Sequence, residues 1–135
     1  AHYWGSEHAY HHTASSPLVY GLAEGLRIIY EEGLPTRFNR HLSNAQLLWR
    51  GLQELGLELF VPENHRLPTL TTVHIPPGVD DLSFRKQLLE KYNIEISGGL
   101  GDLKGKIWRI GLMGYSSREQ NVELLLKALK DLLQK

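Results

Sequence analysis

Cysteine is absent from this chain of 135 residues, which excludes disulfide bonds and thiolate metal sites. No apolar run is long enough for a transmembrane helix. Neither sign of charge is in excess, since 15 lysines and arginines balance 15 aspartates and glutamates. The charge balance therefore gives no reason to expect a nucleic-acid or membrane partner. The remaining composition, 41% hydrophobic and 22% charged, is typical of one globular domain with a real core.

The first residues lack the charged and apolar regions of a signal peptide, and the chain does not begin with methionine. Four of the seven histidines lie here, namely His2, His8, His11 and His12. Their H-x-x-H-H spacing would suit a metal on a helix, but Glu7 is the one carboxylate nearby, so we expect no metal site. We expect an extended segment that contacts a partner or ligand, in a chain cut from something longer.

Leucine and isoleucine recur at helical spacing from Leu18 to Ile29. Ser16 as N-cap followed by Pro17 predicts the helix start, and Gly33 predicts its end. A second helix is expected from about residue 37 to a glycine cap at position 56, and both apolar stripes are expected in the core. Arginines 37, 40 and 50 are interpreted as solvated charges.

Strand-like runs are expected at residues 57–60, 70–75, 94–96 and 107–112. Asp80 or Asp81 is expected to cap a third helix that ends at Asn93. The segment from Ser117 to Gln120 has the pattern of a capping box for the last helix. The order ααββαββα with short connections predicts a two-layer α+β domain, in which helices pack on a mainly antiparallel sheet of three to four strands.

Arg109 lies among apolar residues in the last predicted strand. Alternation places Trp108 and Ile110 on one face, and Ile107, Arg109 and Gly111 on the other. Burying an unpaired guanidinium costs roughly several kcal/mol. We therefore expect Arg109 to lie in a partly open site with a carboxylate or phosphate partner. The planar fork of arginine suits a carboxylate bidentately. The alternatives are an edge-strand arginine in solvent and an intramolecular ion pair.

The glycine-rich loop before this strand does not match a P-loop, because Leu100 stands five residues before Gly105 and a strand follows. We expect its glycines to supply positive φ angles and close backbone approach: Gly98, Gly99, Gly101 and Gly105. Catalytic groups are scarce. The sequence shows no nucleophile elbow, paired carboxylates or dinucleotide fingerprint, and Lys104 and Lys106 lie in or beside an open loop.

Three motifs stand out along the chain: Y-H-H-T from Tyr10, I-S-G-G-L-G from Ile96 and G-K-I-W-R-I-G-L-M-G from Gly105. They occur with V-Y-G-L-A-E-G-L, E-E-G-L, L-P-T-L-T-T-V and S-R-E-Q-N-V. In this order the motifs resemble the alanine–glyoxylate / serine–pyruvate aminotransferases, class V, fold-type I pyridoxal-phosphate enzymes. The resemblance implies the tail of the large domain at residues 1–15 and the C-terminal small domain at residues 16–135.

The resemblance also implies roles for individual residues. Arg109 matches the arginine that binds the carboxylate of the amino donor and of the oxo acid. Tyr10 and Thr13 match residues that reach the phosphate of pyridoxal 5'-phosphate in the neighbouring subunit of a homodimer. Gly98 and Gly99 match a pair in the loop near the substrate, where shape rather than chemistry is expected.

Two departures from the family pattern are present. Ser15 and Ser16 precede Pro17, where the family has a proline sooner. The family's Schiff-base lysine, the aspartate on the pyridine nitrogen and the stacking aromatic match no residue here, so no catalytic residue is assigned, and Lys106 matches a non-catalytic position. The chain alone is therefore expected not to transaminate.

The function implied is part of a pyridoxal-phosphate transaminase that moves an amino group from alanine or serine to glyoxylate or pyruvate. The alternative is an autonomous regulatory module that binds a small carboxylate through Arg109. The sequence ends in Leu133, Gln134 and Lys135, which is not an S-K-L-type peroxisomal signal, so the compartment stays open among peroxisome, mitochondrion and cytoplasm.

Overall fold

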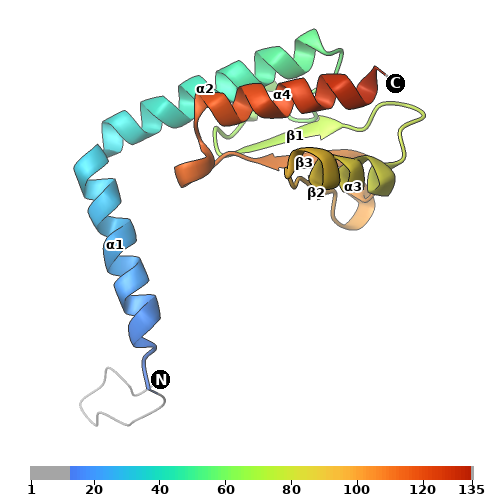
Figure 1. The fold of residues 1–135 in the computed structure, drawn as a ribbon. Helices are drawn as coiled ribbons and strands as arrows, with labels where there is room; N and C mark the ends of the chain where they lie inside the picture. Colours follow the sequence, from blue (N-terminus) through green and yellow to red (C-terminus); the bar gives the residue numbers. More distant parts are fainter. Residues whose placement is uncertain (1–12, 135) are drawn as a thin grey trace. The chain divides into compact units, whose positions relative to one another are not determined.

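A computed structural model describes residues 13–134. Two compact units divide it, one through Arg37 and one from Phe38 onward. The elements in chain order are α1 (Ser16–Glu32), α2 (Leu34–Glu54), β1 (Leu70–His74), α3 (Asp81–Tyr92), β2 (Ser97–Gly98), β3 (Ile107–Gly111) and α4 (Glu119–Leu133), with single 3₁₀ turns at Glu63–His65, Gly101–Leu103 and Gly114–Ser116 (Figure 1). No described helix is both long enough and apolar enough to cross a membrane.

The sheet is antiparallel and three-stranded, in the order β1-β3-β2. β1 pairs with β3 from Leu70↔Gly111 to His74↔Ile107, and β2 adds only Ser97↔Arg109 and Gly98↔Trp108. The predicted α+β class and antiparallel sheet are confirmed. The strand predicted at residues 94–96 was wrong, because β2 begins at Ser97. Residues 57–60 form a single bridge, Leu59↔Val73, rather than a strand.

The core lies on one face of this sheet. Figure 1 shows α2 and α4 alongside each other over the strands, and both helices contribute fully buried side chains. One apolar cluster joins Leu48 of α2, Leu88 of α3, Trp108 of β3 and Leu129 of α4. Phe84 stacks on Trp108 with ring centroids 4.4 Å apart. The helices thus cover the inner face of β3, whereas on its other face Ile107 is buried and Arg109 is half-buried.

The local signals at α3 were accurate. The Asp80 carboxylate accepts a hydrogen bond from the Ser83 backbone N–H at 2.8 Å, as expected of an N-cap. Asn93 ends the helix in the left-handed conformation with φ 55°. By contrast, Ser117 does not cap α4: it is fully buried, and Arg118 stands at the N-cap position without a side-chain hydrogen bond.

The apolar stripe of α1 is exposed, so the expectation that these leucines and isoleucines lie in the core was wrong. Leu18 is 75% exposed, Leu22 63% and Leu26 57%, and none of the α1 residues is buried. Helix α1 begins at Ser16 rather than after it, with Ser15 as N-cap. Gly33 ends it with φ 78°, as predicted. An amphipathic spacing predicts a face that will be covered, but it does not say by which part of a protein.

Helix α2 begins at Leu34, earlier than the sequence suggested. The apolar side chains of α2 are only partly in the core. Ala45, Leu48 and Leu52 are fully buried, whereas Phe38 is 64% exposed. Gly56 follows the helix with φ 75°, and Leu57 N–H donates to the Leu52 carbonyl, which is the expected glycine-based end.

Candidate functional site

Arg109 lies in the central strand of the sheet, on the face opposite the core cluster. Its neighbours Trp108 and Ile110 are buried at 0% and 3% exposure, while Arg109 is half-buried. Thr72 of β1 and Ser97 of β2 lie opposite it on either side. The predicted alternation is therefore confirmed, and the edge-strand alternative for Arg109 was wrong because β3 is the middle strand.

The guanidinium of Arg109 is held at one end. Its Nε donates a hydrogen bond to the Gly98 carbonyl at 2.8 Å. Within residues 13–134, the terminal nitrogens of Arg109 have no hydrogen-bond partner and no carboxylate forms an ion pair with them. Since the Nε is already bonded, the two terminal nitrogens form a fork of the width that a carboxylate accepts bidentately. The arrangement suits an anionic ligand better than the ion-pair alternative.

Gly98 and Gly99 do not have positive φ angles, so that part of the expectation was wrong for both. Gly101 and Gly105 do, at 54° and 72°. What Gly98 and Gly99 permit is close approach. A β-carbon on Gly99 would lie 2.0 Å from the Leu103 carbonyl oxygen, and one on Gly98 would lie 3.2 Å from Asp81 Oδ2. Both glycines thus keep the backbone of the loop tightly packed beside Arg109.

The sequence predicted only a possible capping role for Asp81, yet its carboxylate joins α3 to β3. Its Oδ1 accepts hydrogen bonds from Trp108 Nε1 at 3.0 Å and from Arg85 Nε at 2.7 Å, and its Oδ2 accepts from Arg85 Nη2 at 3.1 Å. The hydrogen bonds from Arg85 lower the pKa of Asp81, which keeps the carboxylate ionised. The i,i+4 spacing of Asp81 and Arg85 was the one signal available in the sequence.

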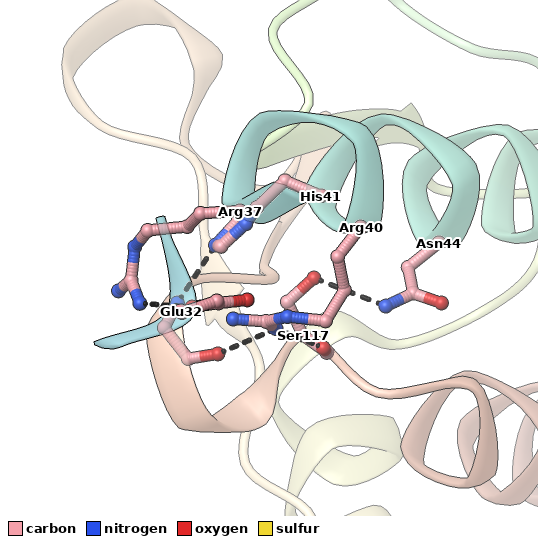
Figure 2. A network of polar contacts seen from close by, with 7 residues as sticks. Glu32, Arg37, Arg40, His41, Asn44 and Ser117 are labelled. Atoms are coloured by element: carbon pink, nitrogen blue, oxygen red, sulfur yellow. Dashed lines mark hydrogen bonds and ion pairs between the residues drawn. The ribbon is translucent and has the colours of Figure 1, made fainter. Parts of the chain in front are cut away.

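Polar side chains of α2 hold the turn after β3 (Figure 2). Arg40 Nη1 donates to the carbonyls of Gly114 and Ser117, at 3.0 and 2.5 Å. His41 Nε2 accepts from the Gly114 backbone N–H at 2.9 Å, and Asn44 Nδ2 donates to Ser117 Oγ at 3.3 Å. The interpretation of Arg40 as a solvated charge was therefore wrong. These contacts fix where the chain leaves the strand that carries Arg109.

Arg37 was likewise not a solvated charge, because its Nη1 lies 2.8 Å from Glu32 Oε2 and both side chains are about one-fifth exposed, at 21% and 19%. Arg50 is exposed, as expected.

Of the two residues predicted to bind the cofactor phosphate, Thr13 and Tyr10, the structure describes only Thr13. Thr13 is exposed. Tyr10 lies outside the described residues, as do His8, His11 and His12. Among residues 13–134 there is no cluster of three or more histidine, aspartate or glutamate side chains that would hold a metal. Lys104 and Lys106 are exposed.

A cavity of about 390 Å³ lies between the end of α3 and the beginning of α4. Its lining includes Asn93, Ile96, Gly111 and Val122 but not Arg109. The candidate site therefore rests on the chemistry of Arg109 rather than on this cavity.

No protein-family model matches the chain. Its sequence is 44% identical over 131 residues to (S)-ureidoglycine–glyoxylate transaminase of Bacillus subtilis, which covers 97% of this chain and 32% of that protein. It is 44% identical over 138 residues to alanine–glyoxylate aminotransferase of Callithrix jacchus, covering 99% of this chain and 33% of that protein.

The fold is similar to a crystal structure of alanine–glyoxylate aminotransferase from Nostoc sp.. The TM-score is 0.90 and the identity is 52%, over 98% of this chain and 35% of that chain. The chain thus spans about a third of the length of the relatives it matches. This similarity extends over nearly all of its residues.

Proposed function

We propose that this chain, a homologue of the alanine–glyoxylate aminotransferases over about a third of their length, supplies the carboxylate-binding part of a pyridoxal-phosphate transaminase. The observation that carries the proposal is the guanidinium of Arg109, bonded through Nε to Gly98 at 2.8 Å with its terminal nitrogens left for a ligand. The relationship to named transaminases favours this function over an autonomous metabolite sensor.

Arg109 would bind the carboxylate that the amino donor and the oxo acid share. A bidentate contact fixes the direction of the bond from the carboxylate carbon to the α-carbon, and so orients the reacting atoms. Because the Gly98 carbonyl already engages Nε, the carboxylate approaches the two terminal nitrogens end-on. Gly98 and Gly99 contribute shape, since an added β-carbon would collide with the Leu103 backbone at Gly99 and would be a tight contact at Gly98.

The geometry of Arg109 and the names of the relatives support a substrate class. Two relatives with different amino donors in their names, ureidoglycine and alanine, both name glyoxylate. The acceptor of the amino group would then be a small oxo acid such as glyoxylate or pyruvate. The amino donor would be alanine or serine. One arginine serves both half-reactions, because each substrate carries the same carboxylate.

Pyridoxal 5'-phosphate supplies the electron sink of transamination when it is bound. The residues here that would contact it are Thr13, which is exposed, and Tyr10. Both hydroxyls are able to donate to a phosphate oxygen. We propose that they do so across the interface of a homodimer. The proposal is compatible with the exposure of Thr13, whereas a buried side chain at that position would have opposed it.

We also propose that residues 1–15 end the large domain and that residues 16–135 form the small domain. The support is the exposed apolar surface of α1, where Leu18 and Tyr20 are each 75% exposed. Apolar side chains in such number on one helix are typical of a surface that another part of a protein covers. The large domain of the parent enzyme would supply that cover.

The test is Arg109→Ala in the full-length transaminase that contains this chain. We expect kcat/KM for alanine and glyoxylate to fall by about 100-fold or more, since positioning and charge-assisted hydrogen bonds are both lost. Arg50→Ala is the matched control, because Arg50 is exposed. Turnover of Arg109→Ala close to that of the control would contradict the proposal.

Calorimetry on the isolated chain separates the enzyme from the sensor. We expect no saturable binding of glyoxylate or pyruvate, because half of a site lacks the groups that enclose the ligand. Stoichiometric binding that disappears in Arg109→Ala would instead favour the regulatory module.

A further inference from the structure

The position of Arg109 depends on a strand that has little stability of its own. β2 consists of Ser97 and Gly98 alone and pairs with β3 at two positions. One further backbone bond, from Gly99 N–H to the Ile107 carbonyl at 3.0 Å, continues the pairing. Isolated short strands are marginal, so contacts outside the sheet must fix where the Gly98 carbonyl points.

Those contacts come from α3. A β-carbon built on Gly98 would lie 3.2 Å from Asp81 Oδ2 and 3.3 Å from Arg85 Nη2. The backbone of Gly98 therefore packs directly against the Asp81–Arg85 ion pair. The carbonyl of the same residue accepts the hydrogen bond from Arg109 Nε. Gly98 thus lies between an ion pair and the proposed ligand-binding guanidinium.

Asp81 also bonds the strand that carries Arg109. Trp108, adjacent to Arg109 in β3, is fully buried and donates its indole N–H to Asp81 Oδ1 at 3.0 Å. One carboxylate consequently contacts β3 through Trp108 and supports β2 through Arg85 and Gly98. Asp81 therefore contacts the neighbour of the donor residue, Trp108 beside Arg109, and packs beside the acceptor residue, Gly98.

We propose that Asp81 is a positioning residue for carboxylate binding: with Arg85 and Trp108 it fixes the Gly98 carbonyl, which in turn aims the terminal nitrogens of Arg109 at the substrate. The inference rests on the proposed role of Arg109. Asp81 does not touch the substrate. Its carboxylate is charged, hydrogen-bonded by two side chains and only 16% exposed, so it forms a rigid support rather than a solvated surface group.

The test uses Asp81→Asn in the full-length transaminase. Asparagine keeps an oxygen for Trp108 Nε1 but removes the charge that pairs with Arg85. We expect KM for glyoxylate to rise about tenfold, a loss of about 1.4 kcal/mol, with kcat changed less than about twofold. Glu90→Gln is the matched control, because Glu90 pairs with Lys86 on the same helix with both side chains largely exposed.

A coupling measurement separates positioning from general destabilisation. If Asp81 acts through Arg109, adding Asp81→Asn to Arg109→Ala produces no further rise in KM. An equal rise in both backgrounds, or an unchanged KM in Asp81→Asn alone, overturns the inference. If Arg109→Ala leaves kcat/KM for glyoxylate unchanged, the proposed function fails first and the inference fails with it.

Gly98→Ala gives a second test should Asp81→Asn not fold. The added methyl group would lie 3.2 Å from Asp81 Oδ2 and 3.3 Å from Arg85 Nη2, so it shifts β2 and the ion pair relative to each other without replacing Asp81, Arg85 or Trp108. We expect the same rise in KM for glyoxylate with a retained kcat. An unaltered KM in a folded Gly98→Ala enzyme would contradict the proposed path from Asp81 to Arg109.

Discussion

Arg109 donates its Nε–H to the carbonyl of Gly98 at 2.8 Å, so a residue of the central strand is tethered to the backbone of its short neighbour. The bond uses one of the five N–H groups of the guanidinium and leaves the terminal pair for a ligand. Lysine has a single nitrogen, so it is unable to keep this bond and form a bidentate carboxylate contact at the same time.

Arg109→Lys therefore separates charge from geometry. In the proposed full-length transaminase we expect an intermediate loss, with kcat/KM for glyoxylate reduced about tenfold to 100-fold, because the positive charge is kept and the fork is not. Steady-state kinetics beside Arg109→Ala checks this. Equal activities of Arg109→Lys and the unsubstituted enzyme would show that a point charge suffices.

Gly99 allows a closer backbone contact than Gly98. A β-carbon at Gly99 would lie 2.0 Å from the carbonyl oxygen of Leu103, which as backbone is unable to rotate away. We expect Gly99→Ala to destabilise the chain by about 2 kcal/mol or more, the range for overpacking a tight site. Gly78→Ala is not a suitable comparison because of its φ of 82°, whereas Gly21→Ala meets nothing within 4 Å. Denaturant unfolding of Gly99→Ala and Gly21→Ala should therefore differ clearly.

The ion pair of Asp81 predicts a pH dependence of stability. Arg85 lowers the pKa of Asp81 in the folded state, so the folded chain binds fewer protons at Asp81 than the unfolded chain does. This contribution is fully present above the ordinary aspartate pKa of about 3.9 and is lost as the pH falls through the lowered folded value. Urea unfolding from pH 5 downward should lose stability less steeply in Asp81→Asn than in the unsubstituted chain.

The adjacent threonines of β1 give opposite expectations. Thr71 Oγ1 accepts a hydrogen bond from Trp49 Nε1 at 2.8 Å, and Thr71 is 4% exposed. Thr72 Oγ1 is buried and has no partner among the described residues. Thr71→Val should cost about 1–3 kcal/mol because it leaves the indole N–H unpaired, whereas Thr72→Val should be neutral or stabilising by up to about 1 kcal/mol. Chemical denaturation of both variants checks the difference, and equal losses would refute it.

Features set by neighbours in the chain could be predicted from the sequence. Asp80 and Asn93 bound α3 because a cap and a left-handed residue act within a few residues. The placement of Arg109 on the face away from the core followed from the period of two in a strand. Each of these signals is complete within a short stretch of sequence.

Features set by distant contacts could not be predicted. Arg40 resembled a surface charge until the fold brought it to carbonyls 74 and 77 residues away. Ser117 resembled a cap, yet its hydroxyl instead accepts a hydrogen bond from Asn44 of α2, 73 residues away. The bond from Trp108 to Asp81 spans 27 residues and depends on how α3 packs on the sheet. The position of Arg109, the proposed ligand-binding residue, could thus be predicted from the sequence, but the residues that support it could not.

Gly51 gives the most direct test of the packing between α2 and α4. A β-carbon there would lie 2.2 Å from Leu126 Cδ1 and 2.8 Å from Cδ2, so the absence of a side chain at Gly51 leaves room for the leucine. Alanine is favoured over glycine within a helix by about 1 kcal/mol, but in Gly51→Ala the leucine must leave its position. We expect Gly51→Ala to destabilise the chain by about 1 kcal/mol.

In the Leu126→Ala background the obstacle is gone, and Gly51→Ala should stabilise by about 0.5–1 kcal/mol through helix propensity alone. The sign of the effect thus depends on the partner, which corresponds to a coupling free energy of about 1.5–2 kcal/mol in a double-mutant cycle. Urea unfolding of the four proteins measures it. Additive effects would mean that Leu126 rotates away at no cost, and that the two helices are not held together through this contact.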